Sequence, residues 1–108
     1  MKTLLDHVKI LSKKCHYAED QVLRSILRND FIIDDDSLLC YSINKGEVGE
    51  IMMMWGEGDG EKIIRWAKSL AKENDCEKLC CISNRWEALC RKFKFRPTGV
   101  LCEMEVCN

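Results

Sequence analysis

Apolar residues near the N-terminus recur at intervals of three and four positions, which is the spacing of one face of a helix. The pattern predicts a first helix over residues 4–15 and a second from residue 18 to about residue 29. Thr3 precedes the first helix and Asp6 follows it three positions later, so the two can form a capping box. The apolar positions are Leu4, Leu5, Val8 and Leu11, then Ala18, Val22, Leu23, Ile26 and Leu27.

From residue 38 onward the apolar positions form short runs, as they do in β-strands. Runs at 38–43 and 48–55 flank a short loop at 44–46 that contains a glycine, and this arrangement predicts a hairpin. The second run is apolar on both faces apart from Glu50. We therefore expect it to be a central strand that is covered on both sides.

The rest of the chain alternates between helix and strand patterns. A glycine-rich loop ends the second strand, and residues 63–71 then have the pattern of an amphipathic helix. A buried strand is predicted at 78–82, a helix capped by Asn84 follows it, and an alternating strand covers 100–106. This order predicts an α/β fold with a mixed, mostly antiparallel sheet flanked by helices. At its centre we expect a parallel strand–helix–strand crossover between residues 49 and 83.

Composition limits the class of protein. The chain has 108 residues, 46% apolar and 32% charged, which suits one domain over residues 1–108 and excludes a disordered chain or a membrane span. The 17 basic and 18 acidic residues nearly cancel. We expect no nucleic-acid partner, because such proteins concentrate positive charge. No secretory signal opens the sequence, which predicts a cytoplasmic protein with reduced cysteines.

Eight cysteines are compatible with a disulfide framework, a zinc site or ordinary core positions. A reducing compartment argues against disulfides, and the absence of a Cys-x-x-Cys pair argues against zinc. Several cysteines lie in apolar runs, where a thiol packs as a small hydrophobic group. We therefore expect core cysteines and no metal site. The three carboxylates at 34–36 lack further ligands and are expected to form a solvated turn.

The glycine-rich junction between the strand at 48–55 and the helix at 63–71 is a candidate anion-binding site. Glycines let backbone N–H groups approach an anion closely, and the N-terminus of a helix adds positive partial charge. A Walker loop is excluded, because Gly60 is followed by Glu61 and Lys62 rather than by Lys-Ser/Thr. The spacing of the glycines also differs from the dinucleotide-binding fingerprint.

A loop of the type Gln/Arg-x-x-Gly-x-Gly/Ala is typical of the GCN5-related N-acetyltransferase (GNAT) superfamily, and the sequence WGEGDG at 55–60 resembles it. The sequence that follows this loop also resembles that of the family. A helix begins at Asn84, and the segment 94–100 resembles the Gly-Phe turn that precedes a final strand in that family. The resemblance covers residues 38–106 and lies in the order and spacing of these motifs.

This resemblance implies an enzyme that transfers an acetyl group from acetyl-CoA to a primary amine of a small molecule or a protein. It implies that the strand ending at Trp55 diverges from the strand at 78–82 and offers backbone groups to the pantetheine arm. Glu50 would be the general base, and Cys90 would protonate the departing thiolate. The residues assigned to the cofactor are Met54, Trp55, Gly56, Gly58, Asp59, Gly60, Glu61 and Asn84.

Simpler explanations stay open for several of these residues. Trp55 stands where the family has Arg or Gln, and three acidic residues between positions 57 and 61 lie where a pyrophosphate is expected. The glycines also suit a tight turn with Asp59 as the helix cap. Glu50 also suits the sheet surface, and Cys90 also suits packing. A second hypothesis is therefore a catalytically inactive protein of this fold that acts through protein contacts, for example a phage accessory or inhibitor protein. An unpaired sheet edge predicts pairing with a second copy.

Overall fold

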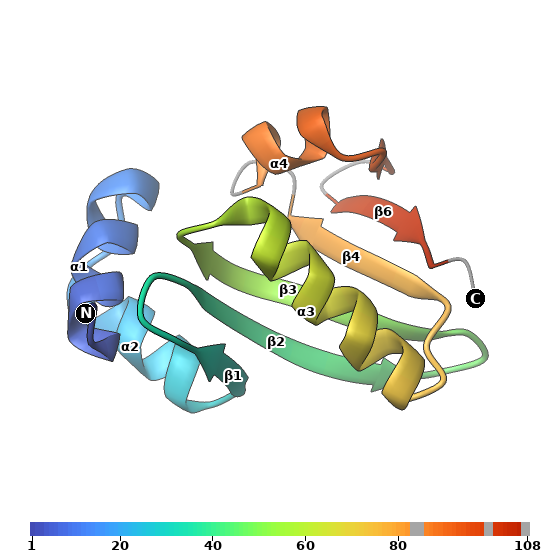
Figure 1. The fold of residues 1–108 in the computed structure, drawn as a ribbon, viewed down its shortest axis with the longest axis horizontal. Coiled ribbons are helices and arrows are strands. Elements are labelled where there is room, and N and C mark those ends of the chain that lie inside the picture. Colours follow the sequence, from blue (N-terminus) through green and yellow to red (C-terminus); the bar gives the residue numbers. More distant parts are fainter. Residues whose placement is uncertain (83–85, 99–100, 107–108) are drawn as a thin grey trace.

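A computed structural model describes residues 1–82, 86–98 and 101–106 of the chain (Figure 1). The helices are α1 (Leu4–Cys15), α2 (Glu19–Leu27), α3 (Gly60–Glu73) and α4 (Glu87–Lys92). The strands are β1 (Asp30–Ile33), β2 (Leu38–Lys45), β3 (Gly49–Glu57), β4 (Lys78–Ile82), β5 (Arg96–Pro97) and β6 (Leu101–Glu105). Together they form a single α/β domain.

The described strands form one mixed sheet with the order β1-β2-β3-β4-β6-β5. Strands β3 and β4 pair in parallel, and every other neighbouring pair is antiparallel. Helix α3 connects β3 to β4, so the predicted central crossover is confirmed (Figure 1). The predicted hairpin is also confirmed, because β2 and β3 pair from Leu38 with Glu57 to Lys45 with Gly49.

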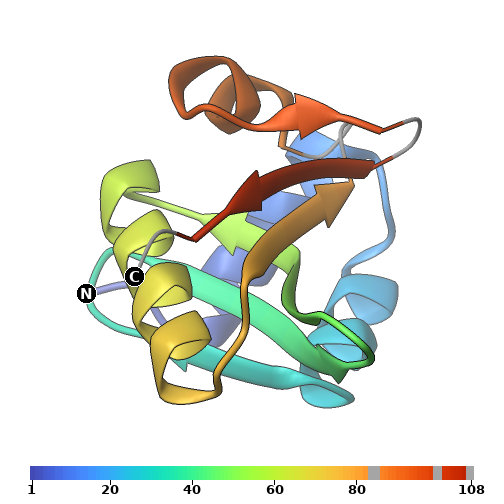
Figure 2. The same cartoon turned by 90° about the vertical axis from the view of Figure 1, so that its right-hand side faces the viewer.

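Helices cover both faces of the sheet (Figure 1, Figure 2). Helix α3 packs one face, where Ile63 and Ala67 join a buried cluster with Leu79. Helices α1 and α2 pack the other face, where Val8 and Val22 belong to a second cluster. Burial of these apolar faces excludes water from both sides of the sheet centre, at roughly 25 cal/mol for each Å² removed from water.

A β-bulge in β3 divides its side chains between the two clusters. Cys40 pairs with Trp55 whereas Tyr41 pairs with Met53, so Met54 is the extra residue. Met53 therefore faces the α3 cluster, and Trp55 faces α1 and α2. The Nε1 of Trp55 donates to Ser25 Oγ at 2.8 Å, so this indole is anchored to α2. A bulge redirects side chains in this way because it shifts the alternation by one residue.

Strands β1 and β5 are absent from the sequence-based expectations. Their four and two residues are too short for an alternating pattern, and each is defined by pairing with a neighbour, β2 or β6. Proline removes a backbone donor and is confined to sheet edges, which is where Pro97 lies. Within the described part of the chain, no helix is both long enough and apolar enough to cross a lipid bilayer.

Candidate functional site

Strand β3 extends beyond its parallel pairing with β4. The paired residues run from Glu50 with Lys78 to Met53 with Cys81, whereas β3 continues to Glu57. The two strands separate toward their carboxyl ends (Figure 1), and a groove of about 490 Å³ opens there. Its walls include the carboxyl end of α1, residues 54–57 of β3, the loop that follows this strand, and Trp86.

Glycines shape the floor of this groove. A Cβ on Gly56 would overlap the indole of Trp86, so the bare backbone allows this buried ring to lie against β3. Gly58 has φ +111°, which lies in the region that favours glycine, and a Cβ there would overlap the backbone of Asp36. The loop at 56–60 therefore packs tightly between Trp86 and the turn at 34–37.

Three backbone N–H groups at the start of α3, those of Asp59, Glu61 and Lys62, have partners within the chain. Asp59 caps the helix, and its Oδ1 accepts from the amides of Glu61 at 3.0 Å and Lys62 at 3.3 Å. The amide of Asp59 itself donates to Ser37 Oγ at 2.9 Å. The interpretation of Asp59 as a helix cap is therefore confirmed. These N–H donors form hydrogen bonds with other groups of the chain.

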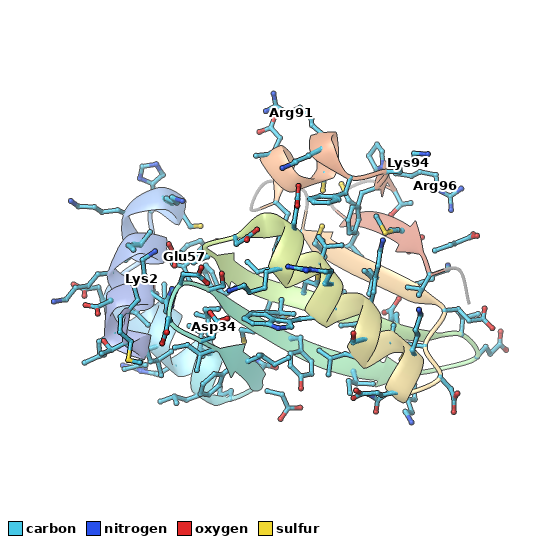
Figure 3. All side chains as sticks on the ribbon, viewed as in Figure 1. Lys2, Asp34, Glu57, Arg91, Lys94 and Arg96 are labelled. Atoms are coloured by element: carbon cyan, nitrogen blue, oxygen red, sulfur yellow. The ribbon has the colours of Figure 1, made fainter. Side chains whose placement is uncertain are left out.

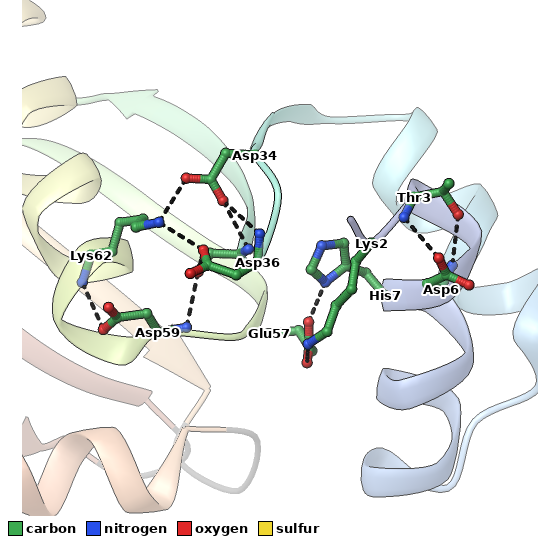
Figure 4. A network of polar contacts seen from close by, with 10 residues as sticks. Lys2, Thr3, Asp6, His7, Asp34, Asp36, Glu57, Asp59 and Lys62 are labelled. Atoms are coloured by element: carbon green, nitrogen blue, oxygen red, sulfur yellow. Dashed lines mark hydrogen bonds and ion pairs between the residues drawn. The ribbon is translucent and has the colours of Figure 1, made fainter.

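The acidic turn at 34–36 is also tied to α3. The Nζ of Lys62 lies 2.8 Å from Asp34 Oδ2 and 2.7 Å from Asp36 Oδ1 (Figure 4). The hydrogen bond from Lys62 holds the pKa of Asp34 at about 2, well below its usual value, and the two carboxylates raise the pKa of Lys62. The sequence predicted a solvated turn, and Asp36 remains largely exposed, but two of the three carboxylates bind this lysine.

A buried ionic group lies at the end of β3. The carboxylate of Glu57, with 5% of its side chain exposed, lines the groove and contacts two residues from the N-terminal segment. The Nζ of Lys2 lies 2.9 Å from Glu57 Oε1 (Figure 3). The Nδ1 of His7 contacts Glu57 Oε2 (Figure 4). His7 is fully buried, and its Nε2 has no partner among the described residues.

Most of the residues assigned to the cofactor lie together. The groove is lined by Met54, Trp55, Gly56, Gly58 and Gly60. Asp59 and Glu61 flank its rim at the start of α3, where Lys92 lies 3.3 Å from the Glu61 carboxylate. Asn84 falls outside the described residues, and so does its predicted role as a cap.

The two residues assigned to acid–base chemistry lie elsewhere. Neither Glu50 nor Cys90 lines the groove. Glu50 is half-buried near the start of β3, about 13 Å from Met54 at 3.3 Å for each residue of a strand. The Sγ of Cys90 lies 3.5 Å from that of Cys81, and burial raises the pKa of the Cys90 thiol to about 11. This thiol stays protonated at neutral pH and packs as the alternative explanation predicts.

Sequence reasoning missed two residues that line the groove, Glu57 and Trp86, and the buried partner of Glu57, His7. The sequence analysis treats the acidic residue at 57 only as a charge opposed to a cofactor, and it gives His7 and Trp86 no role. Their contacts join segments about 30 to 50 positions apart. The sequence did contain one sign that this histidine is buried. It stands at the helical spacing of the apolar residues of the first helix, one position before Val8.

The cysteines that the structure describes are free thiols. Five of them are buried, namely Cys40, Cys76, Cys80, Cys81 and Cys102. Burial raises the pKa of Cys40 and of Cys80 to about 12, so these thiols are uncharged at neutral pH. The expectation of buried core cysteines is confirmed for these five, although Cys80 belongs to neither of the two apolar clusters.

Comparison with known proteins yields no match to a family model, a curated protein or a solved structure.

Proposed function

We propose that the chain is a GNAT-like protein that binds acetyl-CoA in the groove at the end of β3 and transfers its acetyl group to a primary amine. The observation that carries this proposal is the position of the groove. It opens where β3 and β4 cease to pair, and the segment 54–58 that lines it belongs to the stretch that resembles the family's cofactor loop.

Within this proposal, Glu57 is the carboxylate placed to take a proton from the amine. It lines the groove, and its contact with His7 provides a second group that can share the proton. The amine nitrogen bonds to the acetyl carbon, the carbon–sulfur bond breaks, the amine proton passes to Glu57, and a proton returns to the thiolate of CoA. The roles of Glu50 and Cys90 implied by the resemblance stay predictions.

The test is calorimetric titration of the folded chain with acetyl-CoA, followed by measurement of free thiol released in the presence of primary amines. We expect binding, and release of CoA thiol that depends on the amine. Glu57→Gln should retain binding and lose most of the transfer, whereas Glu47→Gln, an exposed change in the β2–β3 turn, should leave both unchanged. Absence of binding at millimolar acetyl-CoA would exclude the enzymatic function.

A second candidate, a catalytically inactive protein that acts through protein contacts, is favoured by one observation. Asp59 occupies the amides of Glu61 and Lys62, which an incoming pyrophosphate would otherwise use. In that case the groove is a remnant of a cofactor site. A folded chain that binds neither acetyl-CoA nor CoA would support this candidate.

A further inference from the structure

Three side chains on adjacent strands converge on the sheet face opposite α3. Glu50 lies on β3, Cys80 on β4 and Glu103 on β6, and Cys80 stands directly opposite Glu103 in the antiparallel register. The Sγ of Cys80 is 3.2 Å from Glu50 Oε2 and 4.0 Å from Glu103 Oε1. One ligand atom from each residue lies within 4.8 Å of the other two.

Cys80 differs from the other buried cysteines that the structure describes. It is 0% exposed, yet it belongs to neither apolar cluster, whereas the other four belong to one or the other. Its polar neighbours are the carboxylates of Glu50 and Glu103. A thiol carries one proton and can donate to only one carboxylate at a time. Because ionised carboxylates only accept, acceptor positions remain beside Cys80 that its single proton does not fill.

Each carboxylate is held by one of its two oxygens. Asn44 Nδ2 donates to Glu50 Oε1 at 3.2 Å, and Lys78 Nζ lies 3.6 Å from Glu103 Oε2. The second oxygen of each carboxylate is the one closer to the sulfur of Cys80. Outer partners that orient carboxylates in this way are typical of metal sites.

We propose that Glu50, Cys80 and Glu103 bind a thiophilic divalent cation, for which zinc is the best fit. With Zn–S of about 2.3 Å and Zn–O of about 2.0–2.2 Å, tetrahedral geometry separates sulfur and oxygen by about 3.5 Å. The two separations observed, 3.2 Å and 4.0 Å, lie on either side of this value. Three protein ligands leave the fourth position for water.

Charge balance also favours a divalent cation at this site. On binding, Cys80 gives its proton to solvent, since a coordinated thiol is deprotonated. The two carboxylates and the thiolate then carry three negative charges, which a divalent cation and the ammonium of Lys78 neutralise. A purely oxygen-binding cation such as Mg²⁺ would leave the sulfur without a role. This use of Glu50 is independent of the acetyltransferase proposal.

Titration of the reduced full chain with Co²⁺, an optical substitute for zinc, tests the proposal. We expect visible bands of tetrahedral cobalt together with a sulfur-to-cobalt charge-transfer band, all removed by added Zn²⁺. Cys80→Ser should abolish the charge-transfer band. Cys81→Ser, a change at the adjacent buried thiol on the opposite face, should preserve it, and this control excludes binding by the Cys81–Cys90 pair.

Two further variants keep the test informative if Cys80→Ser does not fold. Glu103→Gln should weaken Co²⁺ binding by more than tenfold, and Asn44→Ala, an exposed change that removes an outer partner, by about tenfold. Absence of the charge-transfer band in the folded parent would overturn the proposal. So would a band that survives Cys80→Ser, or an affinity that Glu103→Gln leaves unchanged.

Discussion

The imidazole of His7 on α1 and the carboxylate of Glu57 at the end of β3 form a buried contact across 50 positions of the chain. Lys2 binds the other oxygen of Glu57, so the start of the chain is attached to the rim of the groove at two points. Because α1 also supplies a wall of the groove, the position of this helix and the shape of the groove depend on the same ionic group.

Loss of the histidine should therefore destabilise the whole domain. His7→Asn shortens the side chain and leaves Glu57 with Lys2 alone, and we expect the free energy of unfolding to fall by about 1–3 kcal/mol. His16→Asn is the matched control, since His16 is exposed with φ 58°, a conformation that asparagine tolerates, and it should change stability by less than about 0.5 kcal/mol. Urea denaturation measures the free energy of unfolding of both variants. An equal loss of stability in the two would contradict a stabilising role of the buried contact.

The contact between Gly56 and Trp86 predicts strong coupling between the two positions. Gly56→Ala should cost about 1–3 kcal/mol in the parent, because the new methyl group overlaps the indole. In a Trp86→Ala background the same change should cost less than about 0.5 kcal/mol, since the ring is gone. Gly46→Ala, which meets nothing within 4 Å, serves as the control. A penalty that is the same in both backgrounds would show that the overlap is relieved elsewhere.

The Lys62–Asp34 contact predicts how stability responds to acid. A carboxyl group whose pKa is lower in the folded than in the unfolded state stabilises the fold above its unfolded value and loses this contribution as the pH falls. For Asp34 the window runs from near 3.8 down to about 2. Lys62→Met removes the largest cause of the shift, so urea midpoints measured from pH 5 to pH 2.5 should fall less steeply than in the parent. Lys68→Met, at an exposed position on the same helix, should keep the parental slope.

The cap on α3 predicts an effect on cofactor affinity. Asp59→Ser retains a side-chain oxygen for the amides of Glu61 and Lys62 but removes a negative charge from the rim of the groove. We expect acetyl-CoA to bind about fivefold more tightly, which corresponds to about 1 kcal/mol for one charge pair at 4 Å in water. Asp20→Ser, in the exposed first turn of α2, should leave the affinity unchanged. Unchanged affinity in Asp59→Ser would place the phosphates of the ligand away from this helix.

Features that depend on neighbouring residues could be predicted from the sequence. The capping box of Thr3 and Asp6, the boundaries of α1 and the hairpin of β2 and β3 follow from local spacing and are confirmed. The parallel crossover follows from a strand, a helix and a strand in succession, because such connections are right-handed and parallel in nearly all sheets. The resemblance to a cofactor loop located the segment that lines the groove, and the cofactor itself stays a prediction.

The tertiary structure alone decided which distant side chains meet. Nothing in the local pattern pairs His7 with Glu57, places Trp86 against Gly56, or gathers Glu50, Cys80 and Glu103, because these contacts depend on strand order, register and the bulge at Met54. Strands β1 and β5 are defined in the same way, by the neighbour that completes their hydrogen bonds. Sequence periodicity records which face of an element is buried, whereas the partner across that face is chosen only when the sheet and its helices pack together.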